Sequence, residues 1–501
     1  MTPAVSLAPT PRSEAIPATR FVTVSEATGI FLQSLVQSAS DFLGKPILAC
    51  VISVPSSFTV AQKSALMKAA EYAGVHVLQL VDEAGAVAAV TTTDLWINGT
   101  GLNPDRTQLI VDLGVSSLAL NLLSIREGLA HVMASSTHTD VTGNQIDDKL
   151  IKFFAKEFTK KTKMRLTVCP ATTLAEERAE AKLRLAVEHT KRTLAASPGA
   201  ATCSVESLID GLDFTGSINR MRFDMEALSI YKTVAAHVRA LLTEAGVDAH
   251  HVDEIVYVGG STCLPGLDEH LCLEGGFSDF VKTPFSLGTV VGGGVGDPTE
   301  IISRGCALQA ELLFSLGPRD AEVLKAFEKG SLWSEVSVSG RTVGMLFPGT
   351  SLSGDDFGLG GTWIPVLLKE TPLPARRAVT FDVGLSDGRK VFGLEIWEVS
   401  EGVRVEKVAM RRADLSDEEE QDEEQDEEEE EEEEVKYKTV KKEQLLGSLE
   451  MEAKVGVKTK GHWGTTVEVQ FVAGKEGDIR LVVKEVGQGG AMSDLVIVAS
   501  K

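Results

Sequence analysis

The sequence predicts an α/β domain followed by an all-β domain, because the hydrophobic pattern changes its period along the 501 residues. Up to about Leu316, short apolar runs of strand length alternate with longer segments in which apolar residues recur at the helical period. Beyond that point apolar and polar residues alternate one by one, with Gly and Asp between the runs, as in the strands of a sandwich. A chain of this length has room for two or three domains.

The segment Val51–Val90 contains the first elements of the α/β domain. The apolar run ILACVISV predicts a strand that ends at Pro55, and Thr59 and Gln62 have the spacing of a capping box. Gly74 stops the helix that follows, before the second apolar run HVLQLV. The segment therefore predicts a βαβ unit, with an acidic helix start after its second strand.

The same alternation continues through the rest of the domain. We expect strands at Gln108–Asp112, Leu118–Ser124 and Ile255–Val258, and helices through Ile146, Leu150, Phe154 and Phe158, at Leu174–Leu194 and at Met225–Ala245. Asp297 followed by Pro298 has the form of a capping residue with proline at the first helical position, and predicts the start of the last helix.

Four segments beyond Leu316 have the strand period: VTFDVGL, FGLEIWEV, VEVQFVA and IRLVV. They predict a β-sandwich. We expect a mobile tail at 1–22, the α/β domain at 23–316, a linker at 317–340, and the sandwich at 341–501 with an acidic disordered insertion at 415–435.

The net charge of −23 is concentrated in one segment. Asp417–Glu434 holds 16 acidic residues, which leaves −7 for the rest of the chain. Such a run repels itself and buries no apolar area, so it predicts a disordered loop. One interpretation is a contact with basic ribosomal or histone-like surfaces, and the other is an insertion that only keeps the loop solvated.

Composition also excludes several classes of protein. No stretch approaches the roughly 20 apolar residues of a membrane-spanning helix, and the Pro-rich start lacks the apolar centre of a signal peptide. The six cysteines show no C-x-x-C spacing and fit a reducing compartment. We therefore expect a protein of a reducing compartment, the cytosol or the nucleus, with no membrane or secretory role.

Two motifs of the α/β domain carry, by their spacing, a resemblance to a known family, although each alone is a weak signal. VEHTKRTL places Glu188, Lys191 and Arg192 on one helical face, and VGGSTCLP, from Val258, is a glycine turn between a strand and a helix. With the βαβ unit, their order and spacing resemble the heat-shock 70 chaperone family over about Val24–Val498. The resemblance implies an actin-like nucleotide-binding domain, N-terminally incomplete in its first lobe, followed by an all-β sandwich domain without a helical lid.

The resemblance also implies which residues contact the nucleotide. The family's binding positions correspond to Gly114, Ser116, Ser117, Gly143, Glu188, Lys191, Arg192, Gly259, Gly260 and Ser261. Glu188 would hold the ribose hydroxyls, and the two cations would flank adenine. Cys263 replaces the arginine that stacks on adenine in the family, which puts the affinity in doubt.

The phosphate end of this site departs further from the family. Asp112 corresponds to a catalytic carboxylate that holds Mg²⁺ through water, and Glu83 to a glutamate near the phosphates. Val115 replaces a glycine, as does the residue after it, and Ala119 replaces an aspartate. We expect ATP, and with it Mg²⁺, to bind without efficient hydrolysis. Pro55 corresponds to a proline that couples the nucleotide state to domain contacts.

The opening phosphate loop and a lysine of the family's first lobe have no counterpart in the sequence. We expect an exposed sheet edge that a partner covers, or an incomplete gene model. Within the family, the chain is most similar to divergent fungal members that form a ribosome-associated complex with a J-domain protein of the zuotin type. That resemblance implies binding to this J-domain partner and to the ribosome, indirect action on nascent polypeptides, and chaperone activity in protein folding and the stress response. It also implies a cytoplasmic, ribosome-associated protein with no direct sequence-specific nucleic-acid binding.

Two other functions stay open. The first is an active ATP-dependent folding chaperone of the same family, which would need the phosphate loops and the lid. The second is a nucleotide-independent scaffold that binds partners through its sandwich and acidic loop.

Overall fold

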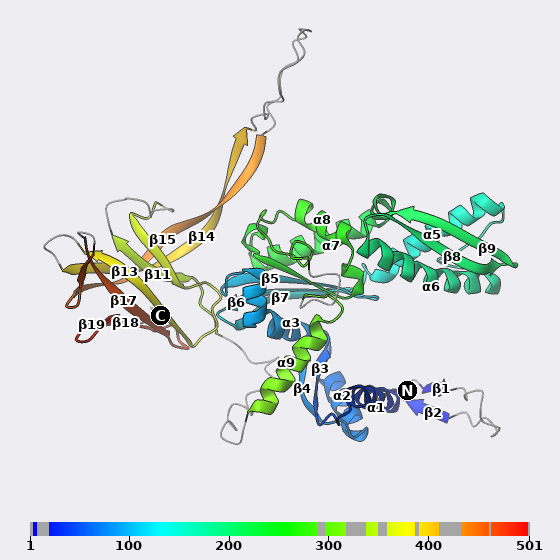
Figure 1. Ribbon diagram of the computed structural model, residues 1–501, viewed down its shortest axis with the longest axis horizontal. Coiled ribbons are helices and arrows are strands. Elements are labelled where there is room, and N and C mark those ends of the chain that lie inside the picture. Colours follow the sequence, from blue (N-terminus) through cyan, green and yellow to red (C-terminus); the bar gives the residue numbers. More distant parts are fainter. Residues whose placement is uncertain are drawn as a thin grey trace, which may run out of the picture. The chain divides into compact units, whose positions relative to one another are not determined.

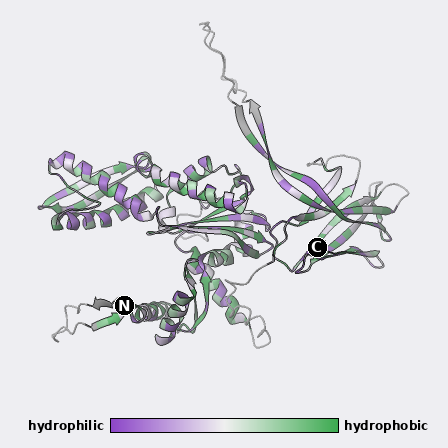
Figure 2. Cartoon of the chain, turned by 180° about the vertical axis from the view of Figure 1, so that it is seen from behind, coloured by the Kyte–Doolittle hydropathy of each residue, from purple (hydrophilic) through white to green (hydrophobic). Residues whose placement is uncertain are grey.

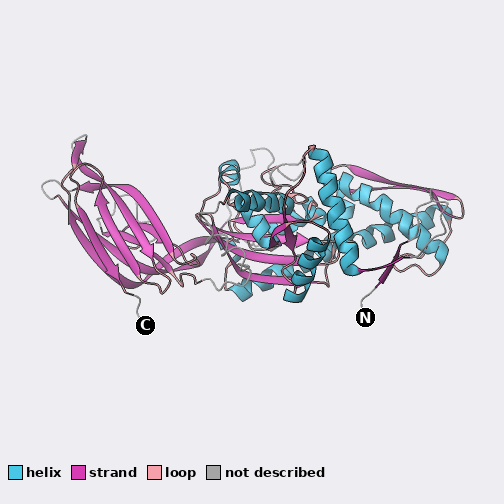
Figure 3. Ribbon diagram, turned by 90° about the horizontal axis from the view of Figure 1, so that it is seen from below, coloured by secondary structure: helices cyan, strands magenta, loops and turns pink. Residues whose placement is uncertain are grey.

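The computed structural model describes residues 4–7, 20–288, 296–316, 337–348, 358–385, 390–409, 432–459 and 462–498. Contacts divide the chain into two compact units, Met1–Val247 with Val252–Glu335 and Val336–Lys501 with Asp248–His251 (Figure 1). The first unit alternates strands and helices, and the long elements of the second unit are strands (Figure 3). The predicted order of an α/β domain and a β-sandwich is confirmed.

The predicted βαβ unit is present in the first unit. The elements of this region are α1 (Val24–Leu43), β3 (Cys50–Val54), α2 (Val60–Tyr72), β4 (Val77–Asp82), α3 (Glu83–Thr91) and α4 (Asp94–Thr100). β3 and β4 are parallel neighbours. Thr59 and Gln62 form the predicted capping box at the start of α2, which stabilises the helix by about 1 kcal/mol. α1 contacts α2 at Gly29, where a Cβ would lie 3.0 Å from the carbonyl oxygen of Ala69.

A four-stranded sheet forms the centre of the first unit, in the order β10-β5-β6-β7. Its strands are β5 (Arg106–Leu113), β6 (Leu118–Arg126), β7 (Leu129–His138) and β10 (Glu254–Val258). β10 runs parallel to β5, and the other pairs are antiparallel. Both faces of the inner strands are buried, which explains their nearly continuous apolar sequences. On one face, Val87 of α3 packs with Ile110 and Val256.

Helices and one hairpin complete the first unit. They are α5 (Gly143–Thr162), α6 (Leu174–Ala196), β8 (Ala200–Ile209), β9 (Leu212–Asn219), α7 (Arg220–Ala245), the 3₁₀ turns η1 (Ala249–His251, counted with the second unit) and η2 (Gly260–Thr262), α8 (Pro265–Glu274) and α9 (Ile301–Ser315). The helical spacing of Ile146, Leu150, Phe154 and Phe158 is confirmed, since all four are fully buried. Polar and apolar residues share the surfaces of α5, α6 and α7 (Figure 2). Among the described helices, none is long and apolar enough to cross a membrane.

Two predictions about the ends of this domain are corrected. The expected mobile tail at 1–22 contains strand β1 (Ala4–Leu7), which pairs antiparallel with β2 (Arg20–Thr23), because short β-branched and apolar runs allow pairing. The last helix begins at Ile301 rather than at Asp297. The Asp297 carboxylate accepts hydrogen bonds from the N–H and the hydroxyl of Thr299, and so forms a local turn before the helix.

The second unit is a sandwich of two antiparallel sheets. Its strands are β11 (Thr342–Pro348), β12 (Gly361–Leu367), β13 (Ala375–Leu385), β14 (Val391–Ala409), β15 (Glu432–Glu452), β16 (Val457–Thr459), β17 (His462–Ala473), β18 (Ile479–Glu485) and β19 (Met492–Ile497). One sheet has the order β12-β11-β14-β15 and the other β13-β17-β18-β19, with β16 on β17. Inward-facing residues such as Ile396, Val469 and Leu481 form its core. The described part of this unit contains no long helix.

The acidic insertion lies at the end of a long hairpin. β14 and β15 stay paired from Val391 with Glu452 to Ala409 with Glu432, and this ribbon extends away from the sandwich (Figure 1). The predicted insertion at 415–435 is therefore corrected at its end, because Glu432 and the residues after it belong to a strand. The rest of the insertion, and most of the predicted linker at 317–340, lie outside the described residues.

Candidate functional site

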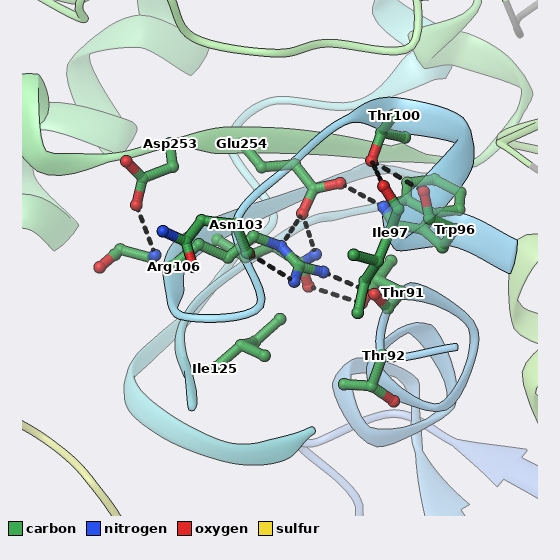
Figure 4. A network of polar contacts seen from close by, with 12 residues as sticks. Thr91, Thr92, Trp96, Ile97, Thr100, Asn103, Arg106, Ile125, Asp253 and Glu254 are labelled. Carbon is green, nitrogen blue, oxygen red and sulfur yellow. Dashed lines mark hydrogen bonds and ion pairs between the residues drawn. The ribbon is translucent and has the colours of Figure 1, made fainter. Parts of the chain in front are cut away.

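A buried polar network sets the register of the two strands that lead to the predicted site (Figure 4). Glu254, at the start of β10, accepts hydrogen bonds from Arg106 Nε at 2.8 Å, Gln108 Nε2 at 2.7 Å and Trp96 Nε1 at 2.7 Å. Arg106 also donates to the carbonyl oxygen of Thr91 at 2.6 Å. Arg106 and Glu254 are both 1% exposed. The network joins α3, α4, β5 and β10.

The same register brings the predicted phosphate-binding residues together at the other end of these strands. Glu254 pairs with Gln108, so four residues later Val258 pairs with Asp112. Gly259 follows Val258 with φ of +86°, a conformation that favours glycine. A Cβ on Gly259 would lie 3.1 Å from Asp112 Oδ1. The glycine turn therefore passes directly beside the carboxylate of β5.

The loop between β5 and β6 is held against the start of α5. Gly114 N–H donates to the carbonyl oxygen of Ser117 at 2.9 Å, which closes the loop. Gly143 N–H donates to the carbonyl oxygen of Gly114 at 2.9 Å, and Asn144 N–H to that of Val115 at 3.1 Å. Ser116, also in this loop, is exposed. The first helical residues of α5 thus lie on the loop, at the helix end that favours anions.

Gly143 also meets the glycine turn. A Cβ at Gly143 would lie 2.2 Å from Ser261 Oγ and 3.0 Å from the carbonyl oxygen of Gly114. A side chain there would displace the buried Ser261. By contrast, a Cβ at Gly260 would meet no atom within 4 Å. The backbone is therefore tightly packed at Gly143 and open at Gly260.

Two carboxyl groups at this edge interact with each other. Burial first, and then the charges of Asp112 and Asp82, together raise the pKa of Glu83 to about 7. Burial also raises the pKa of Asp112 to about 6. Ala119 stands opposite Asp112 in the β5–β6 pair and supplies no further carboxylate. A cation bound here would stabilise both ionised forms.

Pro55 lies at the corresponding end of the smaller sheet. It directly follows β3, whose last residue, Val54, pairs with Asp82 of β4. Asp82 caps α3 and precedes Glu83. Pro55 and Glu83 are therefore the first residues after β3 and β4, at the carboxyl end of both strands. A coupling role for Pro55 would require such a position near Glu83.

The predicted nucleoside-binding trio forms a second group on α6. Lys191 Nζ lies 2.8 Å from Asp147 and 3.0 Å from Glu188, and Arg192 Nε lies 2.9 Å from Glu188. Burial alone would lower the pKa of Lys191, but its bonds to Asp147 and Glu188 outweigh this and raise it. Among the described residues, no hydrogen bond joins the trio to the Gly259 turn.

Asp147 is the residue that the sequence motifs did not identify. It lies four positions after Gly143 on α5, and so on the same helical face. Through its ion pair with Lys191 it links the helix that begins at Gly143, a predicted phosphate-binding residue, to the trio. The sequence does show a carboxylate one turn into a helix that begins with a glycine. That pattern alone does not identify Asp147, because its partner Lys191 is 44 residues away.

Cys263, at the end of the glycine turn, is a neutral thiol. Burial first, and then the charge of Asp297, together raise its pKa to about 11. The thiol offers no cation to a purine face, so any stacking there lacks the contribution that a guanidinium would make.

The geometry fits the phosphates of a nucleotide better than it fits their hydrolysis. Gly143 and Gly259 leave space that a side chain would fill, and the start of α5 and the loop after β5 meet there. Asp112 and Glu83 are the carboxylates that this edge provides for Mg²⁺ or its waters. The opposite position in β6 is Ala119.

Comparisons with known proteins identify relatives over most of the chain. The family model described as Hsp70 protein matches residues 15–324. A heat shock protein 70 homolog of Schizosaccharomyces pombe is 31% identical over 81% of this chain and 66% of its own length. A heat shock 70 kDa protein of Neurospora crassa is 31% identical over 59% of this chain and 42% of its own.

A third relative extends over nearly the whole chain. The ribosome-associated complex subunit SSZ1 of Saccharomyces cerevisiae is 26% identical over 94% of this chain and 78% of its own length. The chain spans 42% to 66% of the length of the heat shock 70 relatives above and of those from other fungi.

Proposed function

Because the chain belongs to the Hsp70 family, we propose that its first unit binds ATP with Mg²⁺ and hydrolyses it slowly. The observation that carries this proposal is the convergence of Gly114, Gly143 and Gly259 at one edge of the central sheet, beside Asp112. All three lie where backbone must approach other backbone closely, the arrangement that admits phosphate oxygens.

The residues of this site would divide the work between binding and charge control. The backbone around Gly114, Ser117 and Gly143 would surround the phosphates, and Glu188, Lys191 and Arg192 would hold the nucleoside. Bound Mg²⁺ would neutralise the phosphate charge. Asp112 would hold the waters of the ion, and Glu83 would orient or accept a proton from a water near the terminal phosphate.

Slow turnover follows from the loop sequence. Val115, 65% exposed, and Ser116 occupy the two loop positions at which glycine would let phosphate approach most closely. With alanine at position 119, the site offers fewer carboxylates to the metal. Such losses weaken transition-state contacts more than they weaken contacts with the nucleoside.

We further propose that the protein acts in a ribosome-associated complex with a J-domain protein of the zuotin type. The support is the match over 94% of this chain to a relative whose name places it in a ribosome-associated complex. In this proposal the protein is cytoplasmic, contacts the ribosome, and assists the folding of nascent polypeptides indirectly.

Gly260→Glu tests nucleotide binding without crowding the backbone. A Cβ there meets no atom within 4 Å, so the fold should persist while a negative charge enters the proposed site. We expect a fluorescent ATP analogue to bind at least about tenfold more weakly, because one lost contact or one new repulsion of about 1.4 kcal/mol has that effect.

Gly99→Glu is the matched control. Gly99 is exposed on α4, and its Cβ would also meet no atom within 4 Å. The control should bind the analogue as the parent does. If Gly260→Glu binds equally well, the nucleotide site lies elsewhere or is absent, and the scaffold function becomes the better explanation. Single-turnover hydrolysis as fast as that of an ordinary heat-shock 70 chaperone would contradict slow turnover while leaving binding intact.

A further inference from the structure

Two histidines and a carboxylate form a cluster outside the proposed nucleotide site. His138 is the last residue of β7, Asp140 lies in the turn before α5, and His237 lies on α7. His237 Nε2 is 3.0 Å from Asp140 Oδ2. The two imidazole rings are stacked, with centroids 3.7 Å apart and planes 19° from parallel. One ligand atom from each residue lies within 4.8 Å of the others.

The donor set is that of a transition-metal site. Two imidazoles and a carboxylate are ligands that Zn²⁺ commonly takes, with a water in the fourth position. Bonds of about 2.0–2.2 Å in a tetrahedral site place the donor atoms roughly 3.3 Å apart. The carboxylate and His237 are already near that separation. An ion bound to an imidazole lies in the plane of the ring, so one of the two stacked rings must turn before both can bind it. The His237 side chain is 21% exposed and that of Asp140 60% exposed, which leaves both room to adjust and lets an ion enter from solvent.

A neighbouring hydroxyl contacts one of the two rings. His138 Nε2 lies 3.0 Å from Ser136 Oγ, a contact of the kind that orients a metal-bound imidazole. Among the described residues, this is the group of three such side chains close enough to share an ion.

We propose that His138, Asp140 and His237 form a binding site for a divalent transition-metal ion, with Zn²⁺ as the best match. The ion would join the end of the edge strand β7 to α7, across the turn that leads into α5. The inference does not depend on nucleotide binding.

The test uses the full chain, freed of metal with a chelator and then titrated with Zn²⁺ against a chromophoric chelator. We expect one Zn²⁺ ion to bind per chain, and this binding should require the side chains of His138, Asp140 and His237. His138→Gln and His237→Gln should each weaken binding at least about tenfold, since even a partner behind a ligand changes affinity by 10- to 100-fold. Co²⁺ should give a visible absorption band in the parent that is lost in both variants.

Two controls separate this site from other donors. His189→Gln removes an exposed histidine of α6, and a double change of His250 and His251 to Gln removes the adjacent pair. Both should bind Zn²⁺ as the parent does. Zn²⁺ should also raise the melting temperature of the parent and not that of Asp140→Asn, which keeps the shape of the side chain.

The proposal is overturned by absence of binding at one equivalent, by unchanged affinity in His138→Gln and His237→Gln, or by loss of binding in a control instead. If the cysteines bind the ion instead, the affinity is unchanged in both histidine variants, and this result also overturns the proposal.

Discussion

Glu83 and Asp112 have pKa values above those of free carboxyl groups, because both are partly buried and because the nearby charges of Asp112 and Asp82 also act on Glu83. A carboxyl group with a raised pKa binds more protons in the folded state than in the unfolded chain. The free energy of unfolding therefore falls as the pH rises from the ordinary pKa to the raised one. For Glu83 this interval runs from 4.5 to about 7.

We predict that Glu83→Gln removes part of this pH dependence. The fall in unfolding free energy between about pH 5 and pH 8 should be smaller in the variant by about 1–2 kcal/mol, after allowance for solvent screening of a partly exposed group. Urea unfolding followed by helical circular dichroism measures it, because the long helices described belong to the first unit. The exposed Glu71→Gln on α2 is the control, and identical pH slopes in Glu83→Gln and the parent would refute the assignment.

Single residues were predictable where their chemistry is local. Thr59 and Gln62 cap a helix by contacts three residues apart, so their spacing alone identifies them. Asp147 was missed because its partner Lys191 lies on another helix. The stacked pair of His138 and His237 was missed for the same reason, since nothing near either residue in the sequence indicates the other.

At the scale of elements, the network around Glu254 decides how β5 and β10 align. Three neutral or cationic donors converge on one buried carboxylate, and Arg106 is nearly inaccessible to water. A buried ion pair contributes little net stability compared with apolar residues of equal size. Removing one member is nevertheless costly, because the other charge stays buried without compensation.

We predict that Glu254→Leu destabilises the first unit by about 3–5 kcal/mol. Adding Arg106→Met should recover much of the loss, because the uncompensated charge is then gone. Arg304→Met, which breaks an exposed pair with Glu300, should cost at most about 1 kcal/mol. The same unfolding measurement compares all of them, and a double variant as unstable as Glu254→Leu would show that the network does not act as a charge pair.

Buried strands were easier to predict from the sequence than exposed ones. β5 and β6 are buried on both faces, so their apolar runs were recognised, although each strand extends a few residues beyond the predicted ends. β7 was not predicted, because it lies at the edge of the sheet and its residues are exposed or half-buried. The extension of β14 and β15 was missed because charged residues fill both strands near the acidic run.

At the scale of the whole molecule, α1 presents an apolar stripe to solvent. The stripe consists of Val24, Phe31, Leu35 and Phe42, which share one helical face and are between 48% and 90% exposed. The small Gly29 makes the contact with α2 instead. An exposed row of large apolar side chains is typical of a surface that associates with something else.

We predict that residues 1–501 expressed alone bind a hydrophobic dye and self-associate through this stripe. Changing both Phe31 and Phe42 to Ser should reduce dye fluorescence by at least half and shift the chain toward monomer in analytical ultracentrifugation. Changing Met221 and Met225, exposed on α7, to Ser is the control and should have little effect. A parent chain that is monodisperse and binds no dye would contradict the prediction.

The architecture as a whole was predictable because its two parts follow different hydrophobic periods. Strands that alternate every second residue cannot be mistaken for α/β material over the length of the sandwich. The convergence of Asp112, Gly143 and Gly259 required the family resemblance, since these residues come from three separate parts of the chain. The exposed apolar stripe on α1 was not predicted, because the sequence of this helix alone does not indicate which face packs.

The network at the start of β5 and β10 has an evolutionary consequence. It holds the strands in register from the end opposite to the loop between β5 and β6, and none of its side chains belongs to that loop. Substitutions at Val115, Ser116 or Ala119 can therefore accumulate without moving Asp112 away from Gly259. In a lineage that no longer needs rapid hydrolysis, the residues proposed for catalysis can be replaced one by one while the arrangement of Asp112 and Gly259 persists.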